Sequence, residues 1–139
     1  MPDLELLKLF FIQHTEYTAA IAFIFGLCFG SFLNVVIYRI PNGLSLSGRS
    51  MCPKCLSTIR WYDNIPVFSY ILLQARCRKC KAHISAKYPS IELLTAYIFG
   101  CCFAISPETG FIHSFAWSLN LVAIGWAEQL YTLSSARLT

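Results

Sequence analysis

The stretch CPKCLSTIRWYDNIPVFSYILLQARCRKC, residues 52–80, carries two cysteine pairs with identical internal spacing. Cys52 and Cys55 form the first pair, Cys77 and Cys80 form the second, and 21 residues separate the pairs. A two-residue gap lets one tight turn present two thiolates to one ion, and zinc takes four such ligands at tetrahedral corners. The spacing therefore predicts a four-thiolate zinc site. Two disulfides or four buried thiols remain as alternatives at this point.

The composition on either side of this stretch is typical of a membrane protein. Of the 139 residues, 56% are hydrophobic and 13% are charged, against about 25% charged in an ordinary soluble domain. The mean hydropathy is +0.56. Three apolar segments occur, and about 20 helical residues suffice to cross a bilayer. We predict an all-α integral membrane protein of about three transmembrane helices, with a cytoplasmic zinc-ribbon-like loop between the first and the second.

The charge distribution predicts the orientation. Nine of the eleven Lys and Arg residues fall between Arg39 and Lys87, where Asp63 is the single acidic residue. Short loops rich in Lys and Arg stay on the cytoplasmic side, and the reducing cytosol keeps thiols free for a metal. The N-terminus has no basic region or small-residue cleavage site, so we interpret the first span as retained.

Within the first span, Gly26 and Gly30 have the G-x-x-x-G spacing. Two glycines four residues apart share one face of a helix and allow another helix to approach closely. We therefore expect a helix–helix contact at this point. The loop of about fifty residues that follows the span is too small to bury a core of its own, and such modules usually depend on a metal or on disulfides.

Five short motifs follow one another along the chain. They are GSFLNVVIYRIP (30–41), SMCPKC (50–55), DNIPVFSY (63–70), RCRKC (76–80) and ISAKYPSIELLT (84–95). Together they closely resemble the N-terminal region of the bacterial type IV prepilin peptidases, over about residues 25–96. That family consists of inner-membrane enzymes that cut the leader from prepilins and pseudopilins and then methylate the new N-terminus.

The resemblance implies several further expectations. The partners would be prepilins or pseudopilins and inner-membrane lipids, and S-adenosylmethionine would join zinc as a cofactor. The location would be the bacterial inner membrane, with the N-terminus periplasmic. A nucleic-acid partner is not expected, because the basic loop is tethered at the membrane.

The expected division of the chain follows its apolar segments and its charges. It is a periplasmic tail (1–16), a first transmembrane helix (17–38), a cytoplasmic zinc-binding loop (39–88), a second transmembrane helix (89–105), a periplasmic turn (106–110), a third transmembrane helix (111–133) and a cytoplasmic tail (134–139).

The chain also departs from the family pattern. Family members are longer and use two aspartates for peptide cleavage, whereas this sequence contains only Asp3 and Asp63, neither in a matching motif. Glu128 falls near the position of the first catalytic aspartate, but chemistry that shares one proton needs two carboxyl groups close together. We therefore expect no catalytic residue here, no peptidase activity of the chain alone, and a truncated enzyme completed by a separate chain. The alternative is a non-catalytic remnant or a membrane adaptor that binds prepilins or secretion machinery.

The sequence suggests roles for five other polar residues, and for three of them it leaves two alternatives open. Asp63 either caps a local turn or belongs to a substrate-handling region, and Glu92 either complements the dipole at the first turn of its helix or holds a basic leader residue. Asn34 either bridges two helices or lines a methyl-donor site. Arg39 is interpreted as an interfacial anchor. His83, three residues after Cys80, is an alternative metal ligand, although four cysteines suffice.

Overall fold

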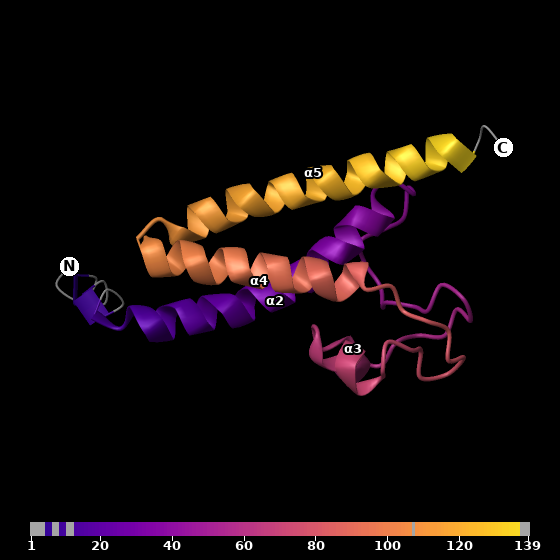
Figure 1. The fold of residues 1–139 in the computed structure, drawn as a ribbon, viewed down its shortest axis with the longest axis horizontal. Helices are drawn as coiled ribbons and strands as arrows, with labels where there is room; N and C mark the ends of the chain where they lie inside the picture. The colour runs from indigo at the N-terminus through magenta and orange to yellow at the C-terminus, as the bar shows by residue number, and fades with distance from the viewer. Residues whose placement is uncertain (1–4, 7–8, 11–12, 107, 137–139) are drawn as a thin grey trace.

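The computed structural model describes residues 5–6, 9–10, 13–106 and 108–136. Its elements are α2 (Thr15–Arg39), the 3₁₀ helix η1 (Trp61–Asn64), α3 (Phe68–Leu72), α4 (Lys87–Ile105) and α5 (Gly110–Ala136). The three long helices form an elongated body, and the segment 40–86, which carries η1 and α3, projects from one end of it (Figure 1). Within the described residues there is no strand, only two isolated β-bridges. The all-α class, with the cysteine loop between the first two long helices, is confirmed.

The helix ends differ slightly from the predicted segments. Helix α2 begins two residues before position 17, and α5 continues three residues beyond position 133. Pro107, in the predicted turn 106–110, lies outside the described residues. The same holds for 1–4, 7–8 and 11–12 of the predicted N-terminal tail and for 137–139 of the predicted C-terminal tail.

Helix α2 buries a single narrow face. Its buried residues are Ala22, Gly26, Gly30, Leu33 and Ile37, which recur every three or four positions and therefore lie on one side of the helix. Large apolar side chains on its other faces stay exposed, among them Ile21 and Ile24, and the same holds for Tyr97 on α4. A hydrocarbon environment explains such a surface, because a soluble monomer rarely exposes a contiguous apolar patch of this extent.

The contact between α2 and α4 is closest at the two glycines. A Cβ placed on Gly26 would lie 2.6 Å from the Cα of Ala96, and one on Gly30 would lie 2.7 Å from the Cα of Glu92. Both distances are too short for any side chain, so only glycine permits this separation of the two backbones. The helix–helix contact predicted from the G-x-x-x-G spacing is confirmed.

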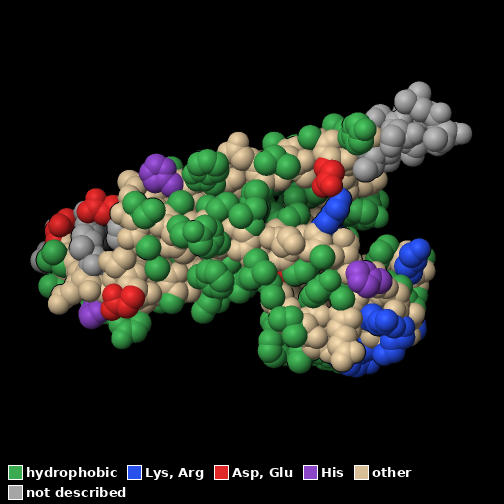
Figure 2. All heavy atoms as spheres, viewed as in Figure 1, with side chains coloured by type: hydrophobic (Ala, Val, Ile, Leu, Met, Phe, Trp, Pro, Cys, Tyr) green, Lys and Arg blue, Asp and Glu red, His purple; other side chains and the backbone are tan. Residues whose placement is uncertain are grey.

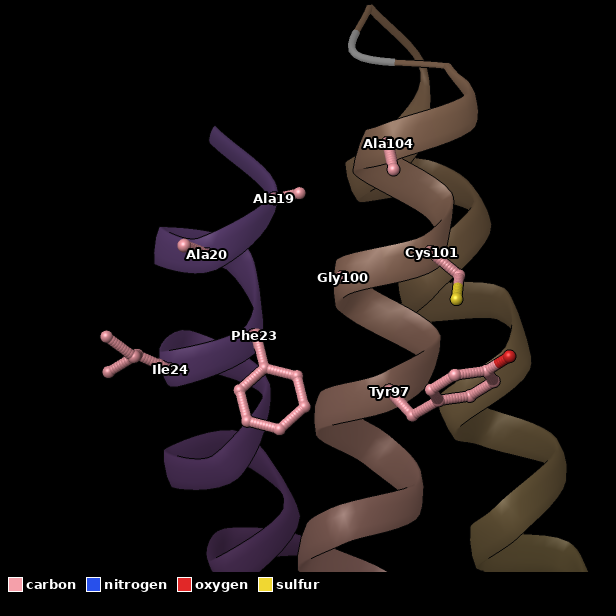
Figure 3. Close-up of a pocket in the computed structure, with 8 residues that line it drawn as sticks. All are labelled: Ala19, Ala20, Phe23, Ile24, Tyr97, Gly100, Cys101 and Ala104. Carbon is pink, nitrogen blue, oxygen red and sulfur yellow. The ribbon is translucent and has the colours of Figure 1, made fainter. Parts of the chain in front are cut away.

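The same two helices are less tightly packed at the end away from the loop. A Cβ on Gly100 would meet its nearest neighbour, in Phe23, at an ordinary 3.6 Å. A shallow apolar groove opens there between α2 and α4, and Figure 3 shows the residues that line it: Ala19, Ala20, Phe23, Ile24, Tyr97, Gly100, Cys101 and Ala104. The close approach of the helices is thus confined to the half nearer the cysteine loop.

Two of the long helices, α2 and α4, are long and apolar enough to cross a membrane. The predicted third span, 111–133, lies within α5 but is not one of these two, so its membrane crossing stays a prediction. Helix α5 nevertheless packs on the other two. Val122 joins Leu33 and Ile37 of α2 in one buried cluster, and Ile91 of α4 packs against that cluster. Gly125 lets α5 approach α2 closely, since a Cβ there would lie 2.9 Å from the side chain of Ile37.

Candidate metal centre

The first cysteine pair sits on a tight turn. The backbone N–H of Leu56 donates to the carbonyl of Cys52 (2.8 Å), and the N–H of Cys52 donates to the carbonyl of Ser57 (3.0 Å). Leu56 has φ of 55°, a left-handed conformation that reverses the chain. An antiparallel bridge between Met51 and Thr58 closes the base of the turn.

The second pair repeats this arrangement with the same register. The N–H of Lys81 donates to the carbonyl of Cys77 (3.0 Å), and the N–H of Cys77 donates to the carbonyl of Ala82 (2.8 Å). Lys81 has φ of 60°, and a bridge between Arg76 and His83 closes this turn. We call the two turns, 51–58 and 76–83, the knuckles. Their equivalence means that each presents its two sulfur atoms in the same way.

The fold brings the four predicted ligands together. The Sγ atoms of Cys52, Cys55, Cys77 and Cys80 all lie within 4.8 Å of one another, and those of Cys52 and Cys80 are 3.8 Å apart. Sulfurs at tetrahedral corners around zinc, with bonds of about 2.3 Å, would be separated by about 3.8 Å. A disulfide needs about 2.05 Å, and all four thiols are free. The arrangement fits a metal ion such as zinc and not a pair of disulfides.

Local hydrogen-bond donors and the neighbouring sulfurs shift the pKa values of three of the thiols, and not all in the same direction. The hydroxyl and the backbone N–H of Ser57 lower the pKa of Cys55 to about 6, and the N–H groups of Cys80 and Lys79 lower the pKa of Cys77. Although the N–H of Ala82 donates to Cys80, loss of solvent and the neighbouring sulfurs raise its pKa to about 11. Four adjacent thiolates repel one another, so a bound cation is what allows all four to ionise together.

The segment between the knuckles is fastened to the second one by an ion pair. Arg78 donates to the carboxylate of Asp63 through Nε (2.8 Å to Oδ2) and Nη2 (2.6 Å to Oδ1). The Arg78 guanidinium also lies 5.7 Å from the ring centre of Tyr62, within cation–π range. Asp63 lies in η1, as the turn prediction requires, but the prediction that its side chain caps local backbone is wrong. Its partner is 15 residues away, which local turn rules do not cover.

We predict that Asp63→Asn loosens the attachment of η1 to the second knuckle. Hydrogen bonding from Arg78 lowers the pKa of Asp63 below its ordinary value, so the fork stabilises the fold above the unfolded-state pKa of about 3.9. That contribution is lost as the pH falls through the lower folded-state pKa. Hydrogen exchange at Trp61–Asn64 should be faster in the variant at pH 7, and the difference should vanish in acid. Lys79→Gln, which removes a neighbouring charge but not the fork, is the control, and equal exchange in all three proteins would contradict the prediction.

A second link joins the loop to the helical body. Oε2 of Glu92 accepts a hydrogen bond of 2.7 Å from the backbone N–H of Val67, and Glu92 is only 8% exposed. Val67 has φ of 58° and ψ of −48°, and the N–H of Phe68 donates to the carbonyl of Pro66 at 2.5 Å. These features describe a γ-turn of the rare, strained kind, centred on a β-branched residue. The carboxylate holds this conformation in place.

The structure corrects the prediction for Glu92. Helix α4 begins at Lys87 and has no acidic residue in its first turn, so Glu92 does not complement the dipole there. The reading in which Glu92 holds a basic leader residue also loses support, because the carboxylate already bonds to Val67. No sequence signal pointed to Val67, since a backbone donor carries no side-chain signature.

We predict that Glu92→Ala releases the segment around Val67. The hydrogen bond from Val67 to Glu92 is partly buried, and an N–H that loses its acceptor away from water costs about 1–3 kcal/mol. Hydrogen exchange at residues 67–72 should accelerate while α4 stays protected. Glu92→Gln retains one acceptor oxygen and should show a smaller effect. Protection at 67–72 that is the same in both variants and in the unaltered chain would refute the role of Glu92.

Arg39 has a larger role than an interfacial anchor. Its Nη1 donates to the carbonyls of Ser45 (3.0 Å), Leu46 (3.1 Å) and Ser47 (2.9 Å), and its Nη2 donates to that of Arg49 (3.1 Å). The last side chain of α2 therefore folds the start of the loop back onto the helix end. A guanidinium has five N–H donors in a planar fork, which makes it suited to collecting several carbonyls.

The remaining predicted residues lie apart from the sulfur cluster. Asn34 donates to the carbonyl of Tyr88 (3.1 Å), which confirms that it bridges α2 and α4. Glu128 forms an ion pair with Lys87 (2.6 Å). His83 belongs to the second knuckle but not to the cluster, and among the described residues the four cysteines form the only group of three or more His, Cys, Asp or Glu side chains placed to hold a metal.

Comparison with known proteins extends these observations. The family model for the bacterial peptidase A24 N-terminal domain matches residues 24–105. A prepilin leader peptidase/N-methyltransferase of Myxococcus xanthus (strain DK1622) is 45% identical over 105 residues, which cover 75% of this chain and 29% of the relative. A type 4 prepilin-like proteins leader peptide-processing enzyme of Escherichia coli O78:H11 (strain H10407 / ETEC) is 41% identical over 119 residues, covering 72% and 44%.

A prepilin leader peptidase/N-methyltransferase of Vibrio cholerae serotype O1 (strain ATCC 39315 / El Tor Inaba N16961) is 49% identical over 88 residues, covering 56% of this chain and 35% of the relative. The chain thus spans less than half the length of each of these relatives. No solved structure matches it. The matched range 24–105 contains most of α2, both knuckles and all of α4.

Proposed function

Because the chain belongs to the bacterial type IV prepilin peptidase family through its N-terminal domain, we propose that it forms the metal-stabilised, membrane-embedded N-terminal part of a prepilin leader peptidase/N-methyltransferase. In this role it would act on prepilins or pseudopilins at the inner membrane. The observation that carries the proposal is the cluster of four sulfurs within 4.8 Å, which lies inside the matched range. S-adenosylmethionine would be the methyl donor of the complete enzyme.

The proposed metal is zinc, and its role is structural. A site closed by four thiolates leaves no open position for a water or a substrate, which is characteristic of structural zinc. The ion would join the two knuckles and so fix the whole segment 51–83. Arg39 and Glu92 would then hold this unit against the ends of α2 and α4 through the hydrogen bonds described above.

The proposed topology places the segment 39–88 in the cytoplasm and the N-terminus in the periplasm. Its support is the concentration of nine Lys and Arg residues between positions 39 and 87, since such loops remain on the cytoplasmic side. Helices α2 and α4 would cross the inner membrane. Helix α5 would be a third span, supported by its length of 27 residues and its packing on α2.

The proposed division of labour assigns this chain a scaffolding part. Two carboxylates that could have been considered for peptide cleavage are engaged elsewhere, Asp63 with Arg78 and Glu128 with Lys87. Peptide cleavage of the aspartic type needs two carboxyl groups that share a proton. We therefore propose that the catalytic carboxylates come from outside residues 1–139, from further sequence or from a separate chain.

A domain-exchange assay tests the proposal. Residues 24–105 would replace the matching region of the Myxococcus xanthus relative, and membranes would receive a prepilin and labelled S-adenosylmethionine. Leader removal and methylation of pre-cleaved pilin would be scored separately. We expect the chimera to perform both reactions and membranes with residues 1–139 alone to cleave nothing. The Glu128→Gln form of residues 1–139 is a control, because cleavage by the unaltered chain that disappears in this variant would overturn the scaffolding assignment.

An inactive chimera that is folded and carries zinc would favour an adaptor that binds prepilins without processing them. Methylation by residues 1–139 alone, without cleavage, would assign the transferase to this part. Each outcome is read only for protein with a full complement of metal, which separates loss of function from loss of folding.

A further inference from the structure

Helix α3 presents an apolar stripe to its surroundings. Phe68, Ile71 and Leu72 are 56%, 66% and 64% exposed, and Ile65, just before the helix, is 41% exposed. These positions follow the i, i+3, i+4 spacing of one helix face. The opposite side faces the protein, because Ser69 is buried and its hydroxyl donates to the carbonyl of Tyr62 (2.9 Å). Among the residues that the structure describes, this stripe of large apolar side chains on the loop is therefore left without a partner.

The stripe lies close to the start of α4, the second of the proposed membrane-crossing helices. The hydrogen bond from Val67 to Glu92 fixes the start of α3 beside the sixth residue of α4. At a rise of 1.5 Å per residue, this point is about 7.5 Å along the axis from the start of α4. Amphipathic helices that lie in a membrane surface bury their apolar face about 5–10 Å into the boundary between headgroups and acyl chains. With the start of α4 taken as the membrane boundary, the distance along the helix falls within this range of depths.

The loop is also polarised in the direction that a membrane requires. In Figure 2, the projecting loop has hydrophobic side chains on its left, toward the end of the helical body that carries the N-terminus. Its Lys and Arg side chains lie on the opposite side, at the right. The segment 39–88 has nine basic residues and one acidic residue, which gives it a strong attraction for anionic lipids. The sulfur cluster and the Asp63–Arg78 ion pair both lie in this loop. They keep its apolar side and its basic side in fixed positions relative to each other.

We propose that α3 is an in-plane membrane anchor, whose Phe68, Ile71 and Leu72 enter the anionic lipid leaflet on the side of the cysteine loop. This inference rests on the proposed crossing of the membrane by α4. Leu94 and Tyr97 of α4 are exposed as well, as a helix that meets lipid requires. The anchor fixes the height of the two knuckles above the bilayer, since η1 and α3 adjoin them in sequence.

Photo-cross-linking in vesicles tests this proposal. A benzophenone side chain would replace residue 68, 71 or 72, one at a time, in the full chain reconstituted with zinc into phosphatidylethanolamine–phosphatidylglycerol vesicles. The control for the membrane crossing is the same side chain at position 94 of α4. The control for the water-exposed side of the loop is position 79. Phospholipid adducts are identified by mass spectrometry, and zinc stoichiometry shows which variants are folded.

We expect lipid adducts at 68, 71, 72 and 94 and none at 79. Adducts at 94 but at none of the zinc-loaded loop positions would overturn the anchor and leave the crossing of α4 intact. Their absence at 94 as well would overturn both. Adducts at 68 that appear equally in purely zwitterionic phosphatidylcholine vesicles would overturn the anionic part of the proposal. A position 68 that cross-links to an added prepilin instead of lipid would identify α3 as a protein-docking surface, contrary to this inference.

Discussion

Cys52→Ser is expected to remove the metal and to unfold the loop that carries the knuckles, while α2 and α4 remain helical. Cys52 is the most deeply buried of the four ligands, 6% exposed, and its sulfur lies 3.8 Å from that of Cys80 in the other knuckle. Structural zinc in small thiolate sites contributes an apparent binding free energy of about 10–16 kcal/mol. A segment with so small a buried core has nothing of similar size to replace it. Cys80→Ser should have the same effect.

The measurement is metal content per chain together with the amount of protein that accumulates in the membrane. Cys28→Ser is the matched control, because Cys28 is an exposed thiol on α2, remote in sequence from both knuckles. We expect full metal content in the control and strongly reduced metal and accumulation in the two ligand variants. Unchanged zinc stoichiometry in both Cys52→Ser and Cys80→Ser would eliminate the site.

Gly30→Leu is expected to separate α2 from α4 and to lower the thermal stability of the helical body in detergent. Even a single Cβ at this position would approach the Cα of Glu92 to 2.7 Å and the Cβ of Thr95 to 3.1 Å. Since the nearest neighbour is backbone, it cannot turn away, and one of the helices must move. Overpacking of this kind typically costs about 1–3 kcal/mol. The shift would also move Glu92 away from Val67, so the loop should exchange hydrogen faster as well.

Gly100→Ala is the matched control for this effect. It adds a Cβ to α4 on the same helix pair, where the nearest atom is 3.6 Å away, and helical alanine is itself favourable. A midpoint of thermal unfolding that falls in Gly30→Leu but not in Gly100→Ala would support the prediction. Equal midpoints in the two variants would mean that the helices do not meet at Gly30 as described.

The features that the sequence predicted are those that a short spacing encodes. The knuckles require two cysteines on one turn, and the helix contact requires two small residues on one face, so Cys52, Cys55, Gly26 and Gly30 could each be interpreted locally. The two pairs of cysteines together then predicted a single site, because four thiolates are a complete ligand set for zinc. The bridging role of Asn34 followed from the cost of a polar side chain within a span.

The contacts that the sequence did not predict join a side chain to a distant backbone group. Arg39 collects carbonyls of the following loop, and Glu92 accepts from Val67, 25 residues earlier in the chain. Backbone donors and acceptors occur at almost every residue, so no residue type marks the chosen one. For Glu92 the predicted helix start was also inaccurate by two residues, since α4 begins at Lys87 and not at position 89. An acid interpreted as near the helix end is in fact one turn inside it.

The positions of these contacts along the chain impose a sequence of events during synthesis. The first knuckle leaves the ribosome with two ligands only, and it must wait for Cys80 before a four-thiolate site can close. The carboxylate of Glu92 emerges later still, so the turn at Val67 cannot be secured until the second helix has begun to form. Because domains generally fold in order from the N-terminus during synthesis, all four cysteines are available to a metal before Glu92 is available to dock the loop. If the proposed zinc is withheld, the segment between the knuckles reaches the start of the second helix without the cross-link that would shape it.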